Sequence, residues 1–345
     1  MYDGPSNSAE GVSMRRHAPA RQRNRTLGSG WINKSDLRDN QPTSGRPPPQ
    51  SCGPSAVPGR YAPSVLTTRS TVRALTQDDL TDFLALAAQD PVVNVFADHR
   101  ARTTNLDRRW LGGEVWGRFV EDRLVAACHV AANLVPVQAG PEDVVAFADR
   151  VLTRPRTVST IVGPSGAVDD LWSRLADQWG HPREVRRRQP HLEIADRPAV
   201  EPDPAVRRTV RGDLDVVYPA CVAMYTEEVG ISPEAGGGAD VYRARVSQLI
   251  ARGWQFARIE DGRVVFKAEV ACASPHAAQI QGVYVAPDRR GEGLAARGMA
   301  AVVEIVRAEV APVVSLYVNE HNRAARRVYE KVGFVETAHF TTVMF

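Results

Sequence analysis

Two hydrophobic periods alternate along the chain from residue 72 onward, and together they predict an α/β structure with a mixed sheet. Alternating or β-rich apolar runs predict strands at residues 72–75, 115–130 (a hairpin), 158–162, 186–194, 206–210, 254–259, 263–273, 280–285 and 313–318, and two short strands in 335–345. Apolar positions spaced three or four apart predict helices at residues 78–89, 168–179, 213–224, 239–251, 295–310 and 322–332.

This order of elements occurs twice. The segment VRALTQDDL at residues 72–80 aligns with VRRTVRGDL at 206–214, and WGRFVEDRLVAACHV at 116–130 aligns with FARIEDGRVVFKAEV at 256–270. The offset is slightly larger in the second pair, and the glycine-rich stretch at 236–238 accounts for the difference as an insertion. We infer an internal duplication. The alternative is that the first segment is an unrelated α/β domain.

Composition separates the segment 1–62 from the rest of the chain. Residues 1–60 contain eight Pro and seven Gly and have nine basic against four acidic residues, so we expect residues 1–62 to be a disordered basic tail. The tail is either a solvated extension or an arm that makes weak nucleic-acid contacts. The remainder carries 34 basic and 36 acidic residues, a balance that does not favour nucleic-acid binding by the folded part.

Cysteine usage and hydropathy indicate a cytoplasmic protein. The four cysteines lie far apart without metal-ligand spacing, so we expect reduced thiols and no metal site. No apolar run has the length needed to span a bilayer. The sequence leaves open whether the protein is a monomer or a homodimer.

The most informative stretch runs from residue 279 to residue 334. After a predicted strand, the turn RRGEG at residues 289–293 leads directly into a helix, so backbone N–H groups and the helix dipole converge on one point. Gly291 and Gly293 lack a Cβ and allow a phosphate to approach closely. Arg290 adds positive charge. The turn therefore predicts an anion site.

A second motif follows the next strand, and the pair identifies a family resemblance. Arg290, Gly293 and Ala295 fit the pattern R/Q-x-x-G-x-G/A, and the helix after it reads N-x-x-A-x-x-x-Y…G-F from Asn322 to Phe334. The two motifs resemble those of the GCN5-related N-acetyltransferase (GNAT) superfamily. The resemblance implies a GNAT fold for residues 205–345, a degenerate GNAT-like domain at 63–197 and a linker at 198–204. The chain is similar to actinobacterial members with an uncharacterised leading domain.

The resemblance also implies the cofactor and the reaction. The chain would be an N-acetyltransferase that uses acetyl-CoA as co-substrate and acetylates an amine-bearing acceptor. Tyr329 would be the general acid that protonates the leaving thiolate, and Asn322 would bond the pantetheine arm. Gly282, in mid-strand, suits a bulge beside the cofactor. The implied cofactor-binding residues are Val283, Tyr284, Val285, Arg290, Gly291, Glu292, Gly293, Leu294, Ala295, Ala296, Asn322 and Ala325.

The residues at the expected general-base positions differ from those of the family pattern. The positions that carry glutamate in two groups of members hold Gln279 and Tyr317 here. Our first substitute is Glu269, which we expect to be half-buried with a raised pKa. Glu227 and Glu228 are the second choice because the loop between the first two helices lines the acceptor site in the family. Water molecules could also serve.

The first copy lacks the signals of a cofactor site. We take its residues 163–170 as the counterpart of the glycine turn, and there Pro164 removes an N–H donor while Asp169 and Asp170 add negative charge. We therefore expect one acetyl-CoA per chain. The first copy would then form a wall of the acceptor pocket or stabilise the second copy. Two other functions stay open: an acetyl-CoA-binding regulatory or scaffold protein with little turnover, and a nucleic-acid-associated protein acting through its tail.

Overall fold

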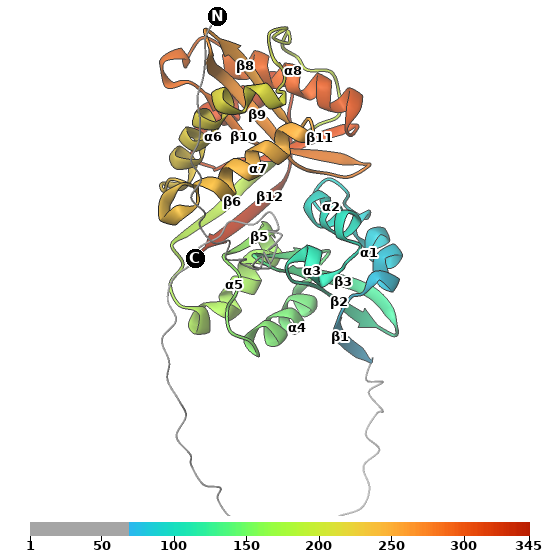
Figure 1. Ribbon diagram of the computed structural model, residues 1–345. Helices are drawn as coiled ribbons and strands as arrows, with labels where there is room; N and C mark the ends of the chain where they lie inside the picture. Colours follow the sequence, from blue (N-terminus) through green and yellow to red (C-terminus); the bar gives the residue numbers. More distant parts are fainter. Residues whose placement is uncertain (1–68) are drawn as a thin grey trace, which may run out of the picture.

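A computed structural model describes residues 69–345, and the predicted disordered tail at 1–62 lies outside the described residues. The described residues form one mixed sheet of twelve strands with helices on both faces (Figure 1). The strands are β1 Ser70–Ala74, β2 Glu114–Val120, β3 Arg123–Val130, β4 Asn133–Val137, β5 Thr160–Pro164, β6 Glu184–Ile194, β7 Arg207–Arg208, β8 Gln255–Glu260, β9 Arg263–Ala273, β10 Ala277–Val285, β11 Val313–Tyr317 and β12 Val335–Met344. The helices are α1 Leu80–Ala87, α2 Val95–Thr104, α3 Arg108–Leu111, α4 Pro141–Leu152, α5 Ser165–Trp179, α6 Leu214–Val229, α7 Ala239–Ala251, α8 Leu294–Glu309 and α9 Arg323–Val332.

The element order repeats, as the duplication predicts. An N-terminal repeat runs from β1 to β6, and a C-terminal repeat runs from β7 to β12. Each opens with the same local contact. Arg73 makes two hydrogen bonds to Asp79, at 2.8 and 2.6 Å, and Arg207 makes two to Asp213, at 2.7 and 3.0 Å. These two pairs occupy the same positions in the first pair of aligned segments.

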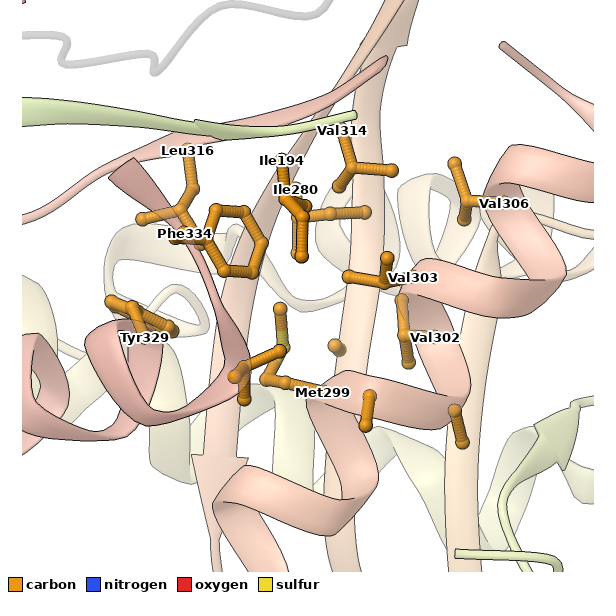
Figure 2. Close-up of a cluster of buried hydrophobic side chains, with 14 of the residues drawn as sticks. Ile194, Ile280, Met299, Val302, Val303, Val306, Val314, Leu316, Tyr329 and Phe334 are labelled. Carbon is orange, nitrogen blue, oxygen red and sulfur yellow. The ribbon is translucent and has the colours of Figure 1, made fainter. Parts of the chain in front are cut away.

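Helices cover each half of the sheet on both faces. In the C-terminal repeat, α6 and α7 pack on one face of the sheet with Ala257 and Val264. On the other face, α8 and α9 pack against Phe256, the neighbour of Ala257, and against Phe266, because an irregularity in the β8–β9 register turns Val264 and Phe266 to opposite faces. Figure 2 shows α8 side chains directed at the strands of this second cluster. In the N-terminal repeat, α1 to α3 cover one face and α4 and α5 the other.

The two repeats exchange their last strands. The sheet order is β1-β2-β3-β4-β5-β12-β6-β11-β10-β9-β8-β7, so β12 lies between two strands of the N-terminal repeat, and β6 lies beside β11 of the C-terminal repeat. Leu192 and Ile194 of β6 are buried in the core under α8, and Val343 of β12 is buried in the core under α4 and α5. Figure 1 shows β6 and β12 running between the two halves of the molecule.

The structure changes two predictions from the sequence, one about residues 335–345 and one about the linker at 198–204. Residues 335–344 form the single strand β12, which pairs with both β5 and β6, and the prediction of two short strands in 335–345 is wrong. The predicted linker at 198–204 is anchored, because the buried Asp203 bonds Arg258 at 2.6 Å. The predicted domain limits stay a prediction, since one sheet runs through both segments.

Candidate acyl-transfer site

A gap opens between two parallel strands in the C-terminal repeat. β10 pairs with β11 only from Ala277 to Gln279, although β10 continues to Val285. The separation coincides with a break in the β9–β10 register at Gly282, which has a φ of +62°. The predicted bulge at Gly282 is therefore present. From Ile280 onward, the side of β10 that faces β11 has no partner strand among residues 69–345 to satisfy its backbone groups, as an inserted amide-bearing chain requires.

The glycine turn forms an open cradle at the start of α8. Gly291 and Gly293 have φ values of +88° and +80°, which favour glycine over residues that carry a Cβ. A Cβ at either glycine would meet no atom within 4 Å, so the space in front of the backbone is open. Within residues 69–345, the N–H groups of residues 291–293 donate no hydrogen bond. Such convergent donors at a helix N-terminus fit the diphosphate of a CoA ester.

The charged side chains of the turn are held by ion pairs. The Arg289 guanidinium lies 2.9 Å from the Glu292 carboxylate and 2.5 Å from the Glu260 carboxylate. The negative charge of Glu292 is therefore paired with Arg289. Arg290 binds the Glu227 carboxylate at 2.7 Å and donates to the Val285 carbonyl at 3.2 Å. The role predicted for Arg290, contact with a diphosphate, stays a prediction and requires this guanidinium to turn.

The other predicted cofactor residues lie on β10, on α8 and at the start of α9, and their role stays a prediction. Leu294 and Ala296 are buried in the α8 face, so their contribution to a cofactor is limited to their backbone. Asn322 caps α9, where its Oδ1 accepts a hydrogen bond from the Ala325 N–H at 3.1 Å. Gly333, with a φ of +108°, ends the helix as predicted.

Tyr329 lies on α9 at the edge of the core cluster (Figure 2). Its ring packs edge-on against Phe334, with 5.8 Å between centroids, and 7% of the residue is exposed. Burial, with a smaller effect from the negative charge of Glu228, raises the pKa of the Tyr329 phenol. The phenol is therefore protonated throughout the neutral range, as a proton donor must be.

Glu269 differs from its prediction. Burial alone would raise the pKa of its carboxyl, but Lys267 and Arg245 outweigh that effect and leave the pKa lowered. The Lys267 Nζ lies 3.0 Å from Oε2, and Gln281 donates to Oε1 at 2.8 Å. The expected half-buried carboxyl with a raised pKa is wrong, because a buried lysine sits beside it. A base role for Glu269 stays untested, and both of its oxygens are occupied.

Replacing Glu269 is expected to cost stability. In Glu269→Gln the fully buried Lys267 loses its anionic partner, and we expect the free energy of unfolding to fall by about 3 kcal/mol at pH 7. Because the folded carboxyl has a lowered pKa, its contribution is present above the unfolded value of about 4.3 and is lost as pH falls below it. The deficit should therefore shrink in acid.

Urea unfolding of both proteins at pH 7 and below pH 4 measures this difference. Asp288→Asn is the matched control, because Asp288 forms an exposed pair with Arg263 and its loss should not move the midpoint. An unchanged midpoint for Glu269→Gln would contradict the structural role of the pair.

A cleft of about 650 Å³ opens where the end of α6 meets the start of α9. Glu227 and Glu228 lie in the last turn of α6, and the loop that we expected there begins after them. The cleft is lined by Glu184, Arg186, Glu227, Glu228, Val229, Gly230, Asn319, His321, Asn322, Arg323 and Ala324. Glu227 and Glu228, the second choice for the general base, therefore line the same cleft as Asn322. Glu269 is not part of the lining.

The lining includes residues that sequence reasoning missed. Arg186 comes from β6 of the N-terminal repeat and bonds both Glu184 and Glu228. Asn319, which follows β11, donates to the Glu228 Oε1 at 3.2 Å. One signal in the sequence could have indicated a basic partner such as Arg186. Two adjacent glutamates at the C-terminal end of a helix interact unfavourably with the negative end of the helix dipole, so cationic side chains are expected nearby.

The counterpart of the glycine turn in the N-terminal repeat is also corrected. The element order matches β10–α8 with β4–α4, whereas residues 163–170 join β5 to α5 and match β11–α9. At the start of α4, Gly140 is followed by Pro141, and Asp143 already accepts the Gly140 N–H at 2.8 Å. An acidic side chain thus occupies the helix N-terminus. The expectation that this repeat lacks a phosphate cradle now rests on these residues.

Residues 69–345 hold neither a candidate metal site nor a candidate membrane-spanning helix. These residues contain no group of three or more His, Cys, Asp or Glu side chains placed to hold a metal ion. Their helices include none that is long and apolar enough to cross a membrane.

The splayed strands, the amide-lined turn and the buried tyrosine are the features of an acyltransferase of the GNAT type. Residues 253–334 match the model of the Acetyltransferase (GNAT) family. Residues 113–217 match a domain of unknown function, DUF4081, and this match runs from β2 across β6 into α6. The predicted family and tandem fold class are confirmed. A search of curated proteins gave no match.

Solved structures agree on the fold. An acetyltransferase of the GNAT family from Colwellia psychrerythraea is 14% identical with a TM-score of 0.50, over 80% of this chain and 99% of that one. A GCN5-related N-acetyltransferase from Sphaerobacter thermophilus is 20% identical with a TM-score of 0.50, over 79% and 94%. A protein described as from Drosophila malonogaster is 13% identical with a TM-score of 0.53, over 79% and 98%. At these identities the likeness concerns the fold.

Proposed function

We propose that the protein is an acetyl-CoA-dependent N-acetyltransferase whose single active site lies in the C-terminal repeat. The observation that carries the proposal is the open cradle of unbonded N–H groups at residues 291–293, together with the side of β10 that β11 leaves unpaired. A diphosphate fits the cradle, and an amide-bearing arm fits the gap beside β10. The acceptor is a compound or peptide that bears an amine and enters the cleft at the end of α6.

Two residues divide the proton transfers between them: Glu228, which lines the cleft, and Tyr329, which is buried on α9. Glu227 and Glu228 each keep one oxygen that accepts no hydrogen bond from the described residues, and we assign the base to Glu228 because Glu227 is paired with Arg290 of the glycine turn, whereas Glu228 is held in the cleft by Arg186 and Asn319. Glu228 takes one proton from the acceptor ammonium, whose nitrogen then attacks the acetyl carbonyl. Acetyl-CoA supplies the acetyl group as a thioester, whose C–S bond breaks as the C–N bond forms. Tyr329 protonates the leaving sulfur and regains a proton from the nitrogen as it becomes an amide.

Tyr329→Phe is expected to lower kcat by about 100-fold while leaving the Kd for acetyl-CoA nearly unchanged. The phenyl ring keeps the packing against Phe334, and only the transferable proton is lost. Because the phenol pKa is raised, the wild-type rate should not fall as pH rises through about 10 on account of this group. Stopped-flow release of CoA thiol measures the rate. Tyr218→Phe, whose hydroxyl bonds Glu234 away from the cleft, is the control and should retain full activity.

One acetyl-CoA is expected per chain. The N-terminal repeat has Asp143 at its corresponding helix N-terminus, so repulsion of a diphosphate leaves only the C-terminal cradle. Isothermal titration of residues 61–345 with acetyl-CoA should give a stoichiometry near one. A value near two would show that the N-terminal repeat also binds the cofactor.

The direct test of the proposed function is acetyl-CoA consumption with a panel of amines. Spermidine, kanamycin, a lysine-containing peptide and a peptide with a free N-terminus cover the main acceptor classes. Acetylation of at least one amine above the rate of hydrolysis is expected. Tight binding of acetyl-CoA without acetylation of any amine would instead support a cofactor-binding regulatory role.

A further inference from the structure

The Glu228 carboxylate is held by the N-terminal repeat, although Glu228 itself lies in the C-terminal repeat. Arg186 of β6 donates from its NH1 to the Glu228 Oε1 at 2.5 Å and from its NH2 to the Glu228 carbonyl oxygen at 2.8 Å. The same guanidinium binds Glu184, with Nε at 2.7 Å from Oε1. Only 13% of the Arg186 side chain is exposed, so the fork is fixed in one orientation.

A second path from β6 reaches the same oxygen. Gln189 is buried and donates to the Asn319 Oδ1 at 2.9 Å, and Asn319 donates to the Glu228 Oε1 at 3.2 Å. Gln189 is itself fixed by Thr342 of β12, whose hydroxyl donates to its Oε1 at 2.6 Å. Both exchanged strands thus contribute to the position of one carboxylate in the cleft.

All of these contacts use one oxygen of the carboxylate. The other, Oε2, receives no hydrogen bond from the described residues and belongs to a side chain that is 48% exposed. A carboxylate gripped at one oxygen and free at the other can face a ligand in a fixed direction. A helix cap alone would need only the bond from Arg186 to the carbonyl oxygen of Glu228.

We propose that Arg186, supplied by the exchanged strand of the N-terminal repeat, is a positioning residue that aims the free Glu228 oxygen at the acceptor amine. This inference rests on the proposed function. It gives the N-terminal repeat a part in catalysis without a ligand of its own. The acceptor site is then incomplete in the C-terminal repeat alone.

A double-mutant cycle tests the inference. The proteins are the wild type, Arg186→Met, Glu228→Gln and the double variant, and the probe is acetyl-CoA with the amine of the panel above that the wild type acetylates fastest. Arg186→Met should lower kcat/KM for the amine by at least about tenfold and leave the Kd for acetyl-CoA unchanged. In the Glu228→Gln background, Arg186→Met should have almost no further effect, because the two residues act as a unit.

Two further variants separate positioning from folding. Arg187→Met is the matched control, since Arg187 is the next residue of β6 and forms an exposed pair with Asp169, so kcat/KM should not change. Arg186→Lys keeps the charge but cannot form all the bonds of the guanidinium, and it should give an intermediate kcat/KM with an unaltered melting temperature.

The outcomes distinguish a failure of the positioning role of Arg186 from a failure of the proposed acetyltransferase function. A wild type that binds acetyl-CoA but acetylates no amine overturns both. An active wild type with an equally active Arg186→Met overturns the positioning role alone. Equal losses from Arg186→Met in the wild-type and Glu228→Gln backgrounds would also overturn it, because they would show that Arg186 acts independently of Glu228.

Discussion

A chain that begins at residue 198 is expected not to fold, although it contains the whole matched GNAT segment. In such a fragment β12 loses both of its neighbours, since it pairs only with β5 and β6. β11 is left with an open edge, and the core under α8 loses Leu192 and Ile194. Loss of even one such buried side chain costs about 2–5 kcal/mol, which is a large part of the stability of a domain.

Co-expression of two fragments provides the control. Residues 69–197 and 198–345 made together are expected to form a soluble heterodimer with a single cooperative unfolding transition, because the exchanged strands can still pair across the cut. Each fragment alone should aggregate or show no transition by circular dichroism. If the 198–345 fragment alone folds and binds acetyl-CoA, that result would contradict the strand exchange. The predicted domain limits would then mark independent folding units.

Gly293→Val is expected to abolish measurable binding of acetyl-CoA. A valine side chain would project into the space in front of the amides, where no protein atom lies within 4 Å of a Cβ. The φ of +80° at this position also disfavours any β-branched residue, so the N–H groups would lose their convergence. The protein should stay folded, because the side chain points away from the core.

Calorimetric titration with acetyl-CoA measures the loss, and thermal unfolding checks the fold. Gly166→Val is the control, because Gly166 lies at the exposed start of α5 in the other repeat and also has open space around its Cβ position. That variant should bind acetyl-CoA like the wild type. Binding that survives Gly293→Val would mean that the turn is not the cradle.

Local features of the C-terminal repeat were predictable from sequence because they depend on nearby residues. The glycine turn, the Asn322 cap and the Gly333 stop are set by backbone preferences within a few positions. The bulge at Gly282 follows from a glycine inside a strand. The duplication was readable because the pair formed by Arg73 and Asp79 recurs at the start of the C-terminal repeat.

Features that depend on partners distant in sequence were not predictable. The alternation in β6 identifies a strand but is the same whichever strands lie beside it, so the exchange left no signal. The pKa of Glu269 depends on Lys267, and the burial of that lysine beside the carboxylate is set by packing against elements distant in sequence. The counterpart of the glycine turn was misplaced because β4 and α4 were not recognised, and without them the fifth strand was taken for the fourth.

The exchanged strands also set the timing of folding during synthesis. β6 leaves the ribosome long before β11 and β12 exist, and at roughly 5–20 residues per second its partners follow on the order of ten seconds later. During that interval the edges of β5 and β6 are unpaired, and the Leu192 and Ile194 side chains have no core to enter. The nascent N-terminal repeat is thus an incomplete sheet that must avoid other chains until β12, the last strand to be made, arrives.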